Sequence, residues 1–324
     1  MKILNRVALL LVLACASAAA QADAYPNRTI TLVVGFPPGG GADAVARIVG
    51  DKMAKILGQS IVINNKPGAG TTLASEFVAH APGDGYTLLM GGVGSMYGTD
   101  QLLYKSARYD GIKDFTAITR WSSAPLLLAV RKDFPAQDVR ALMQEARKAP
   151  DKLTYSSSGI GVAPHVAGLE FAQMAGIRML HVPFKGGAPS IQAVAAGDVD
   201  MTFGTPPSVL PMAKTGMLRI LAATTARRSP LFPDIPGMQE SGVDNYDFTF
   251  WFGLWGPAGL PPEVTRRLYE ASVEALKDPE VQSNLEKQGN QAAPSASVDE
   301  FRAWAVQDGQ RYKDLVSRSG AIQQ

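Results

Sequence analysis

The clearest structural signal in the chain is residues 29–41, which read TITLVVGFPPGGG. The first six residues are apolar or β-branched and predict a short buried strand. The glycine- and proline-rich remainder can continue neither a strand nor a helix, so it predicts a loop. Apolar side chains then recur at helical spacing from Val45 to Leu57, and Gly58 ends the predicted helix. Strand, glycine-rich loop and helix in this order are typical of a parallel α/β sheet.

The same order of elements continues to about residue 90. Residues 61–63 predict a second strand, residues 64–70 a second glycine-rich loop, and residues 71–80 a second helix. A turn at residues 82–85 leads into a third predicted strand at residues 86–90. Together these elements predict one βαβαβ unit.

A second βαβαβ unit is predicted about 120 residues later in the chain. Its strands are predicted at residues 153–155, 179–182 and 199–203, and each is followed by a loop rich in glycine, serine or proline. Helices are predicted to begin near Pro164 and Pro189, because proline is favoured at the first position of a helix. The repeat therefore predicts two α/β lobes.

Two extended stretches, residues 115–130 and 218–224, are interpreted as crossings between the lobes. Because two crossings return the chain to its starting lobe, the C-terminal part should complete the first lobe. That part contains an aromatic run at residues 248–255 and three predicted helices, at about 263–276, 279–288 and 298–317. The predicted first lobe is discontinuous and comprises residues 25–122 and 224–324, and the second lobe comprises residues 123–223.

The N-terminus has the features of an export signal. Lys2 and Arg6 precede an apolar run at residues 7–16, and Ala22-Asp23-Ala24 fits a cleavage site. We therefore predict a signal peptide over residues 1–24, cleavage after Ala24 and a periplasmic location. A lipoprotein anchored through Cys15 is the alternative. Cys15 is the only cysteine, so its removal would leave no disulfide and no cysteine nucleophile.

Length, composition and charge exclude several classes of protein. The chain has 324 residues, which suggests two domains, and 46% hydrophobic with 19% charged residues fits a folded core. The formal net charge is only +2, from 31 basic and 29 acidic side chains. No basic face is implied, so we predict no nucleic-acid partner.

Glycine recurs in five loops that follow predicted strands. In a parallel sheet such loops gather at one edge, where ligands bind. Four of the loops lead directly into helices, whose N-termini offer N–H groups and partial positive charge to an anion. The glycines are Gly39, Gly40 and Gly41; Gly68 and Gly70; Gly91, Gly92 and Gly94; Gly159 and Gly161; Gly186 and Gly187. The pattern predicts an anion-binding cleft, although strand-to-helix turns also contain glycine for structural reasons alone.

The motifs of common enzymes are missing from the sequence. It has no phosphate-binding Walker pattern, no complete dinucleotide fingerprint and no Gly-x-Ser-x-Gly elbow. The three histidines are not at metal-ligand spacing, so we predict no metal and no cofactor. Ser158 and His165 leave one enzymatic alternative, an exported α/β hydrolase. Asp43, in the first turn of its helix, is expected to complement the helix dipole more than to contact a ligand amine.

Several of these segments resemble the Bug-type solute-binding proteins, the periplasmic receptors of tripartite tricarboxylate transporters. The resemblance covers nearly all of the chain after residue 24. The matching segments are residues 25–34, 36–43, 64–70, 82–88, 155–165, 181–187, 197–200, 251–254 and 257–259. It implies a type II periplasmic-binding-protein fold, with two lobes, two crossing strands and a cleft that closes on a ligand.

The resemblance also implies a small organic carboxylate as ligand, membrane transporter subunits as partners and no catalysis; a monomer is expected. The candidate ligand-binding residues are Phe36, Pro38, Gly39, Gly40, Gly41, Asp43, Ala69, Gly70, Thr71, Thr72, Ser157, Ser158, Gly159, His165, Gly186 and Thr205. The chain has Gly204 where relatives often carry Asp, which disfavours an amino-acid ligand. A receptor that reports to a sensor protein, with the same fold, is a further alternative.

Overall fold

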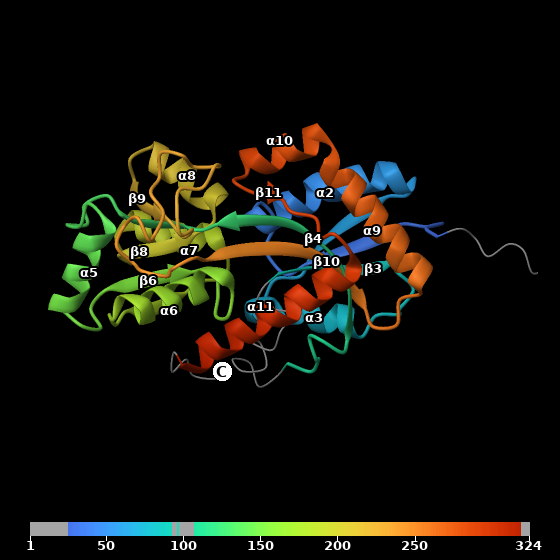
Figure 1. The fold of residues 1–324 in the computed structure, drawn as a ribbon, viewed down its shortest axis with the longest axis horizontal. Helices are drawn as coiled ribbons and strands as arrows, with labels where there is room; N and C mark the ends of the chain where they lie inside the picture. The colour runs from blue at the N-terminus through green and yellow to red at the C-terminus, as the bar shows by residue number, and fades with distance from the viewer. Residues whose placement is uncertain (1–24, 93–95, 97–106, 319–324) are drawn as a thin grey trace, which may run out of the picture.

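The computed structural model describes residues 25–92, 96 and 107–318. The predicted signal peptide, with Cys15, and also Gly94 lie outside the described residues. Figure 1 shows two lobes lying side by side along the long axis of the molecule, each built on its own sheet. This arrangement confirms the predicted two-lobe α/β fold.

The first lobe is built on a six-stranded sheet with the order β11-β4-β10-β3-β1-β2. The strands are β1 (Ile30–Val34), β2 (Ile61–Asn65), β3 (Thr87–Gly92), β4 (Phe115–Pro125), β10 (Thr249–Pro257) and β11 (Gln291–Ala292). β1 pairs in parallel with β2 and with β3, which confirms the first βαβαβ unit. The helices of this lobe are α2 (Gly41–Leu57), α3 (Thr72–Ala79), α9 (Pro262–Lys277) and α10 (Pro279–Lys287), and a short 3₁₀ turn, η1 (Ala69–Thr71), precedes α3.

The second lobe is built on a five-stranded sheet with the order β7-β6-β8-β5-β9. The strands are β5 (Leu127–Arg131), β6 (Thr154–Ser157), β7 (Leu180–Pro183), β8 (Met201–Gly204) and β9 (Leu218–Ala223). β6 pairs in parallel with β7 and β8, which confirms the second βαβαβ unit. Its helices are α5 (Val139–Lys148), α6 (Ala163–Ala175), α7 (Gly187–Ala196) and α8 (Pro206–Lys214).

Both sheets are mixed, because each parallel unit is extended by antiparallel strands. β10 pairs antiparallel with β3 and β4, and β5 pairs antiparallel with β8 and β9. The inner parallel strands, such as β1 and β8, are covered on both faces and are largely apolar, whereas the edge strands β2 and β7 are partly exposed. In β1, for example, Ile30, Leu32, Val33 and Val34 are all buried, and α2 packs Val45 and other apolar side chains into the same core.

The two connections between the lobes meet at one buried residue, Thr224. β4 and β5 are separated only by Leu126, and β10 begins one residue after Phe248. The N–H of Leu126 donates to Thr224 Oγ1 at 2.8 Å, and this hydroxyl donates to the carbonyl of Phe248 at 2.7 Å. Backbone hydrogen bonds also join Thr224 to Leu126 and to Phe248. The crossings are therefore tied to each other where the chain passes between lobes.

The long segment between β9 and β10 lies against the second lobe before the chain crosses. Ala223 pairs with the segment through a hydrogen bond to Pro236, and the Tyr246 hydroxyl donates to the carbonyl of Ala167 at 3.0 Å. The predicted lobe boundaries, at 122/123 and 223/224, stay predictions.

The last helix, α11 (Val298–Arg318), runs from the first lobe towards α6 of the second (Figure 1). Phe301, near its start, is fully buried beside Trp251 and Trp255 of β10. Arg311, near its end, pairs with Glu170 of α6 at 2.8 Å. Thus α11 contacts both lobes. In the part of the chain that the structure describes, no helix has the length and apolar character of a membrane span.

Candidate functional site

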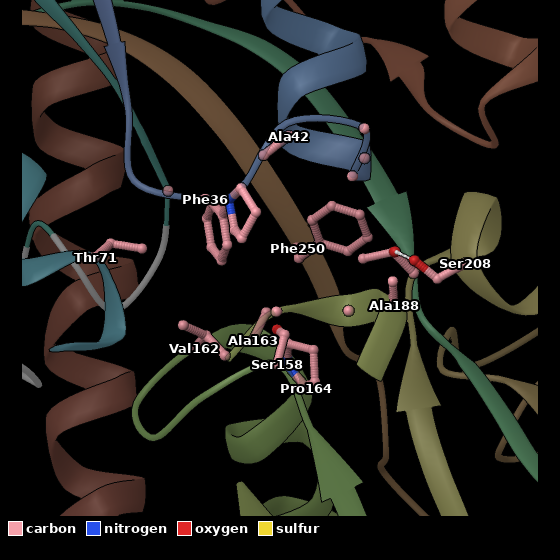
Figure 2. A pocket seen from close by; sticks show the side chains of 18 of the residues that line it. Phe36, Ala42, Thr71, Ser158, Val162, Ala163, Pro164, Ala188, Ser208 and Phe250 are labelled. Carbon is pink, nitrogen blue, oxygen red and sulfur yellow. Dashed lines mark hydrogen bonds between the residues drawn. The ribbon is translucent and has the colours of Figure 1, made fainter. Parts of the chain in front are cut away.

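A cavity of about 220 Å³ lies between the lobes and is lined by both (Figure 2). A second cavity of about 570 Å³ adjoins it, and the two share Phe36, Thr71, Ser158 and Lys185 among their lining residues. The lobes approach each other closely around these cavities: a Cβ atom on Gly186 would lie 3.3 Å from Pro37.

Most of the candidate residues line one or both cavities. The first cavity is lined by Phe36, Pro38, Gly39, Gly40, Gly41, Thr71, Ser158, Gly186 and Thr205. The second is lined by Phe36, Ala69, Gly70, Thr71, Ser158, Gly159 and Gly186. The glycine loops of the two lobes therefore face one another across a common space. Four candidates line neither cavity and lie behind its wall: Asp43, Thr72, Ser157 and His165.

Asp43 holds the first glycine loop against α2. Its carboxylate accepts hydrogen bonds from the N–H of Gly39 at 3.0 Å, from Arg47 at 2.9 and 3.0 Å, and from Asn65 at 3.1 Å. Burial acts to raise the pKa of Asp43, but these hydrogen bonds outweigh burial and hold the pKa below its usual range. Asp43 is thus an ionised structural group that shapes the cavity wall from behind.

Ser157 and two histidines fix the loop of the second lobe. The Ser157 hydroxyl donates to the carbonyl of Gly159 at 2.7 Å and lies 2.6 Å from Nε2 of His181. The N–H of Gly161 donates to Nδ1 of His165 at 3.0 Å, so the proton of the neutral ring is assigned to Nε2. The rings of His165 and His181 stack with centroids 4.1 Å apart.

Both histidines are kept neutral. Burial lowers the pKa of His165 to about 4, and burial together with the neighbouring His165 lowers the pKa of His181 to about 3. A general base also needs to reach its nucleophile, yet Nδ1 of His165 is occupied by Gly161, and no hydrogen bond joins His165 to Ser158 among the described residues. The geometry gives no support to a Ser158–His165 dyad.

Five helices begin at the cavities without a side-chain cap. Their N-cap residues are Gly40 (α2), Thr71 (α3), Val162 (α6), Gly186 (α7) and Thr205 (α8), and each N-cap lines a cavity. Away from the cavities, α5 and α10 are capped by Asp138 and Asp278, whereas α9, with Pro261 as its N-cap, has no side-chain cap. The first N–H groups of a helix have no partner within the helix and attract anions. α8 offers no free N–H there, because Pro206 and Pro207 have none and Ser208 donates to the carbonyl of Thr205. The donors come mainly from α2, which begins with Gly41 and Ala42, and from α7, which begins with Gly187 and Ala188; all four residues line the first cavity.

The η1 turn adds a strained segment to this wall. Ala69, Gly70 and Thr71 have φ angles of 45°, 60° and 85°, all in the left-handed region. This conformation is costly for alanine and more so for a β-branched threonine, and such strain is typical of ligand-binding segments. Thr71 is buried and lines both cavities, and its Oγ1 has no hydrogen-bond partner in the described part of the chain. A buried hydroxyl of this kind points to a ligand that supplies the partner.

Several lining residues were not predicted from the sequence. Phe250 and Phe252 of β10 form part of the wall of the first cavity, Val162 and Pro164 contribute from α6, and Ser208 contributes from α8. The aromatic run was visible in the sequence, but its place beside the cavity depends on how β10 crosses between the lobes.

The position of Gly204 also differs from the sequence-based interpretation. A Cβ atom there would lie 2.4 Å from Val209 and 2.8 Å from Ile191, inside the core of the second lobe. Thr205, the next residue, is the one that lines the cavity. A side chain at position 204 would therefore face apolar packing, so its absence removes no partner from the cavity.

The two lobes, the paired crossings and the lined cleft define a periplasmic binding protein by fold. A family model described as "Tripartite tricarboxylate transporter family receptor" matches residues 45–321, and the chain belongs to this family. The family consists of solute-binding receptors without catalytic activity, so the hydrolase alternative is rejected. In the described residues, no group of three or more His, Cys, Asp or Glu side chains could hold a metal ion.

Solved structures agree with this assignment. A structure of the periplasmic binding protein BugD is 30% identical, with a TM-score of 0.84 over 93% of this chain and 100% of that one. Rpa4515 of Rhodopseudomonas palustris, solved with adipate, is 32% identical, with a TM-score of 0.86 over 91% of this chain and 98% of that one. MatC from the same organism, solved with malate, is also 32% identical, with a TM-score of 0.83 over 90% and 100% of the two chains.

Proposed function

We propose that this receptor captures a small organic carboxylate in the cleft between its lobes and delivers it to the membrane subunits of a tripartite tricarboxylate transporter. The carboxylate is held by backbone N–H groups at the start of α2 and at Ala69 and Gly70, and by the hydroxyl of Thr71; the N–H groups of Thr71 and Thr72 donate to the carbonyls of Gly68 and Ala69 instead. The second lobe closes over it with Ser158, Gly159 and Gly186.

One observation carries this proposal above the others. Helix N-termini from both lobes begin at the same cavities without side-chain caps, and the buried Thr71 hydroxyl beside them has no partner among the described residues. Each helix terminus stabilises an anion by about 0.3–1 kcal/mol in an exposed setting, and by more when partly buried. The adipate and malate of the two Rhodopseudomonas palustris relatives are carboxylates, which supports the same chemistry here.

The receptor acts in the periplasm, after export and removal of residues 1–24, as a single chain. Ligand binding closes the lobes by a hinge motion about the two crossings at Leu126 and Phe248. The closed form is the one that the membrane subunits recognise. Deleting the gene should abolish uptake of the ligand; a loss of ligand-induced transcription with uptake unchanged would instead indicate a sensory receptor.

A thermal-shift screen tests the ligand class directly. The purified mature protein is heated with mono-, di- and tricarboxylates and, as controls, with neutral sugars. A ligand present at 100 times its Kd should stabilise the folded state by about 2.7 kcal/mol, which moves the unfolding temperature measurably. A shift with sugars and none with any carboxylate would overturn the proposal.

A further inference from the structure

The first cavity has an apolar back wall that comes from a crossing strand. Phe250 and Phe252 project from the same side of β10, and their rings pack edge to face with centroids 5.4 Å apart. Both are at least nine-tenths buried, with exposed fractions of 4% and 7%. Trp251, the residue between them, donates to Asp308 of α11 and helps to anchor the strand.

Apolar groups of both lobes face this cavity. Phe36 reaches it from the first lobe, and the first turn of α6 contributes Val162, Ala163 and Pro164 from the second. Figure 2 shows Phe36 and Phe250 on one side of the cavity and the α6 residues on the other. A ligand bound between them would contact hydrocarbon on two sides, and the contact area would increase as the lobes close.

One polar side chain of the same cavity, Ser158, lies beside the α6 residues, and the others lie towards its ends. Thr71 lies at one end, and at the other Thr205 and Ser208 bond to each other through their hydroxyls at 3.1 Å (Figure 2). Of the lining residues that the structure describes, Lys185 alone has an ionisable side chain, and this residue is exposed to solvent. A second carboxylate held by Lys185 would remain in water, where an ion pair contributes little, and the hydroxyls at the far end of the cavity already bond to each other.

We infer that the ligand is a carboxylate with an apolar body, an aliphatic or aromatic monocarboxylate, and that Phe250 and Phe36 determine this specificity. This inference rests on the proposed function, because it concerns the part of the ligand beyond its carboxylate. Thr71 and the backbone N–H groups beside it bind the carboxylate, and the two phenylalanines with the α6 turn enclose the hydrocarbon.

The physical reason is the cost of placing polar groups against this wall. Burial of the ligand's apolar surface against this wall favours binding. A hydroxyl, amine or second carboxylate of the ligand that faces Phe250 instead loses its hydration and gains no hydrogen-bond partner. An apolar pocket rejects a ligand that merely adds a hydroxyl only modestly, by about 100-fold at most. The expected discrimination is therefore about 10- to 100-fold.

Isothermal titration with matched carboxylates tests the inference. Hexanoate and adipate share a carbon chain and differ in the second carboxylate; succinate and malate differ in one hydroxyl; acetate lacks the body. We expect hexanoate to bind at least about tenfold more tightly than adipate and than acetate, and succinate more tightly than malate.

Two variants locate the effect. Phe250→Ala should weaken hexanoate binding by about tenfold or more while acetate binding changes little, because only the body loses contacts. Phe36→Ala tests the same contact if Phe250→Ala fails to fold, because Phe36 lies on a loop and not in a strand. Phe77→Ala is the matched control, since Phe77 is an exposed aromatic side chain on α3 that lines neither cavity.

Each contrary outcome has a distinct meaning. If adipate bound more tightly than hexanoate, and Lys185→Gln removed this preference, a second carboxylate would be recognised. That result would overturn the inference and leave the proposed carboxylate receptor intact. Equal binding of hexanoate by the wild type, Phe250→Ala and Phe36→Ala would overturn it as well. Binding of no carboxylate would defeat the proposed function itself.

Discussion

Gly40 is a residue at which a side chain would fill the cavity without straining the backbone. Its φ and ψ angles are −87° and 173°, an extended conformation that any residue adopts. A Cβ atom added there would have only the carbonyl of Pro37 nearby, at 3.8 Å. The fold therefore does not require glycine at position 40, and we propose that Gly40 serves the approach of a ligand to the backbone.

For Gly40→Val we expect at least a tenfold loss of carboxylate affinity, equivalent to about 1.4 kcal/mol, because the side chain occupies the space in front of the N–H groups. The unfolding temperature should stay close to that of the wild type. Gly50→Ala is the control on the same helix, where the added methyl makes ordinary contacts at 3.7 Å. Titration and thermal unfolding measure the two effects. Unchanged affinity in Gly40→Val would contradict the proposal that backbone N–H groups hold the carboxylate.

His165 makes stability depend on pH. In the folded protein burial lowers its pKa to about 4, whereas the unfolded chain titrates near 6.5. Between these values the unfolded state binds the extra proton, so the stabilising contribution is complete above about pH 6.5 and is lost as the pH falls towards 4. Between pH 7.5 and pH 5 the loss from His165 is about 2 kcal/mol.

We expect His165→Gln to flatten the pH dependence of the unfolding free energy in this range, measured by urea titration at a series of pH values. The part of the His181 effect that comes from burial, which has the same sign, should remain. His80→Gln is the control, because His80 is exposed at the end of α3. Equal slopes for wild type and His165→Gln would show that His165 is not buried in its neutral form.

At the scale of elements, the sequence predicted the two βαβαβ units because their boundaries are local. Each strand is a short apolar run, and each loop contains glycine or proline residues that stop it. Helix α8 was missed because Pro206, Pro207 and Pro211 mask a helix that begins with proline at its first turn. Helix α5 was not predicted either, although its sequence carries a local signal: Asp138 as N-cap before apolar residues at helical spacing.

The antiparallel strands could not be predicted in the same way. β4, β10 and β11 lie together in the first sheet although more than 100 residues separate β4 from β10. Their pairing depends on the chain returning from the second lobe, and no local pattern records it. The same return places Phe250 and Phe252 against the cavity, so the glycine loops of the site were predictable and its aromatic wall was not.

The hydroxyl of Thr224 is expected to stabilise the two crossings between the lobes. Thr224→Val keeps the shape of the side chain but removes the hydroxyl that joins Leu126 to Phe248. The buried N–H of Leu126 then has no partner, which should lower the unfolding free energy by about 1–3 kcal/mol in urea titrations. Thr224→Ser, which retains the hydroxyl, should lose much less; an equal loss in both variants would mean that the methyl group and not the hydrogen bonds stabilises the crossing.

At the scale of the whole molecule, one ion pair links the lobes at a distance from the crossings. α11 is anchored in the first lobe by Phe301 and by the hydrogen bond between Asp308 and Trp251 at 2.8 Å. It then reaches α6, where Arg311 donates to Glu170 at 2.8 Å and to the carbonyl of Asp247 at 3.1 Å. Because α6 begins at the first cavity, this ion pair holds the part of the cavity wall formed by the start of α6 against the first lobe.

Glu170 is buried, and only one of its carboxylate oxygens is paired: Oε2 has no partner among the described residues. Burial raises the pKa of Glu170, and Arg311 opposes this increase without cancelling it. The pair therefore stabilises the molecule only as long as Arg311 compensates the buried charge. Removing Arg311 alone is the more harmful change, because it leaves the carboxylate buried and unpaired.

For Arg311→Met we expect a loss of about 2 kcal/mol in unfolding free energy, less than for a fully buried pair because the arginine side chain is half exposed. The lobes of the ligand-free protein should also separate further, giving a larger radius of gyration in small-angle scattering and weaker ligand binding, since the closed form becomes less populated. Combining Arg311→Met with Glu170→Gln removes the uncompensated charge and should restore most of the stability, but the lobes should stay open because no ion pair joins them. A double variant that regains both stability and compactness would show that the pair neutralises charge locally and does not hold the lobes together.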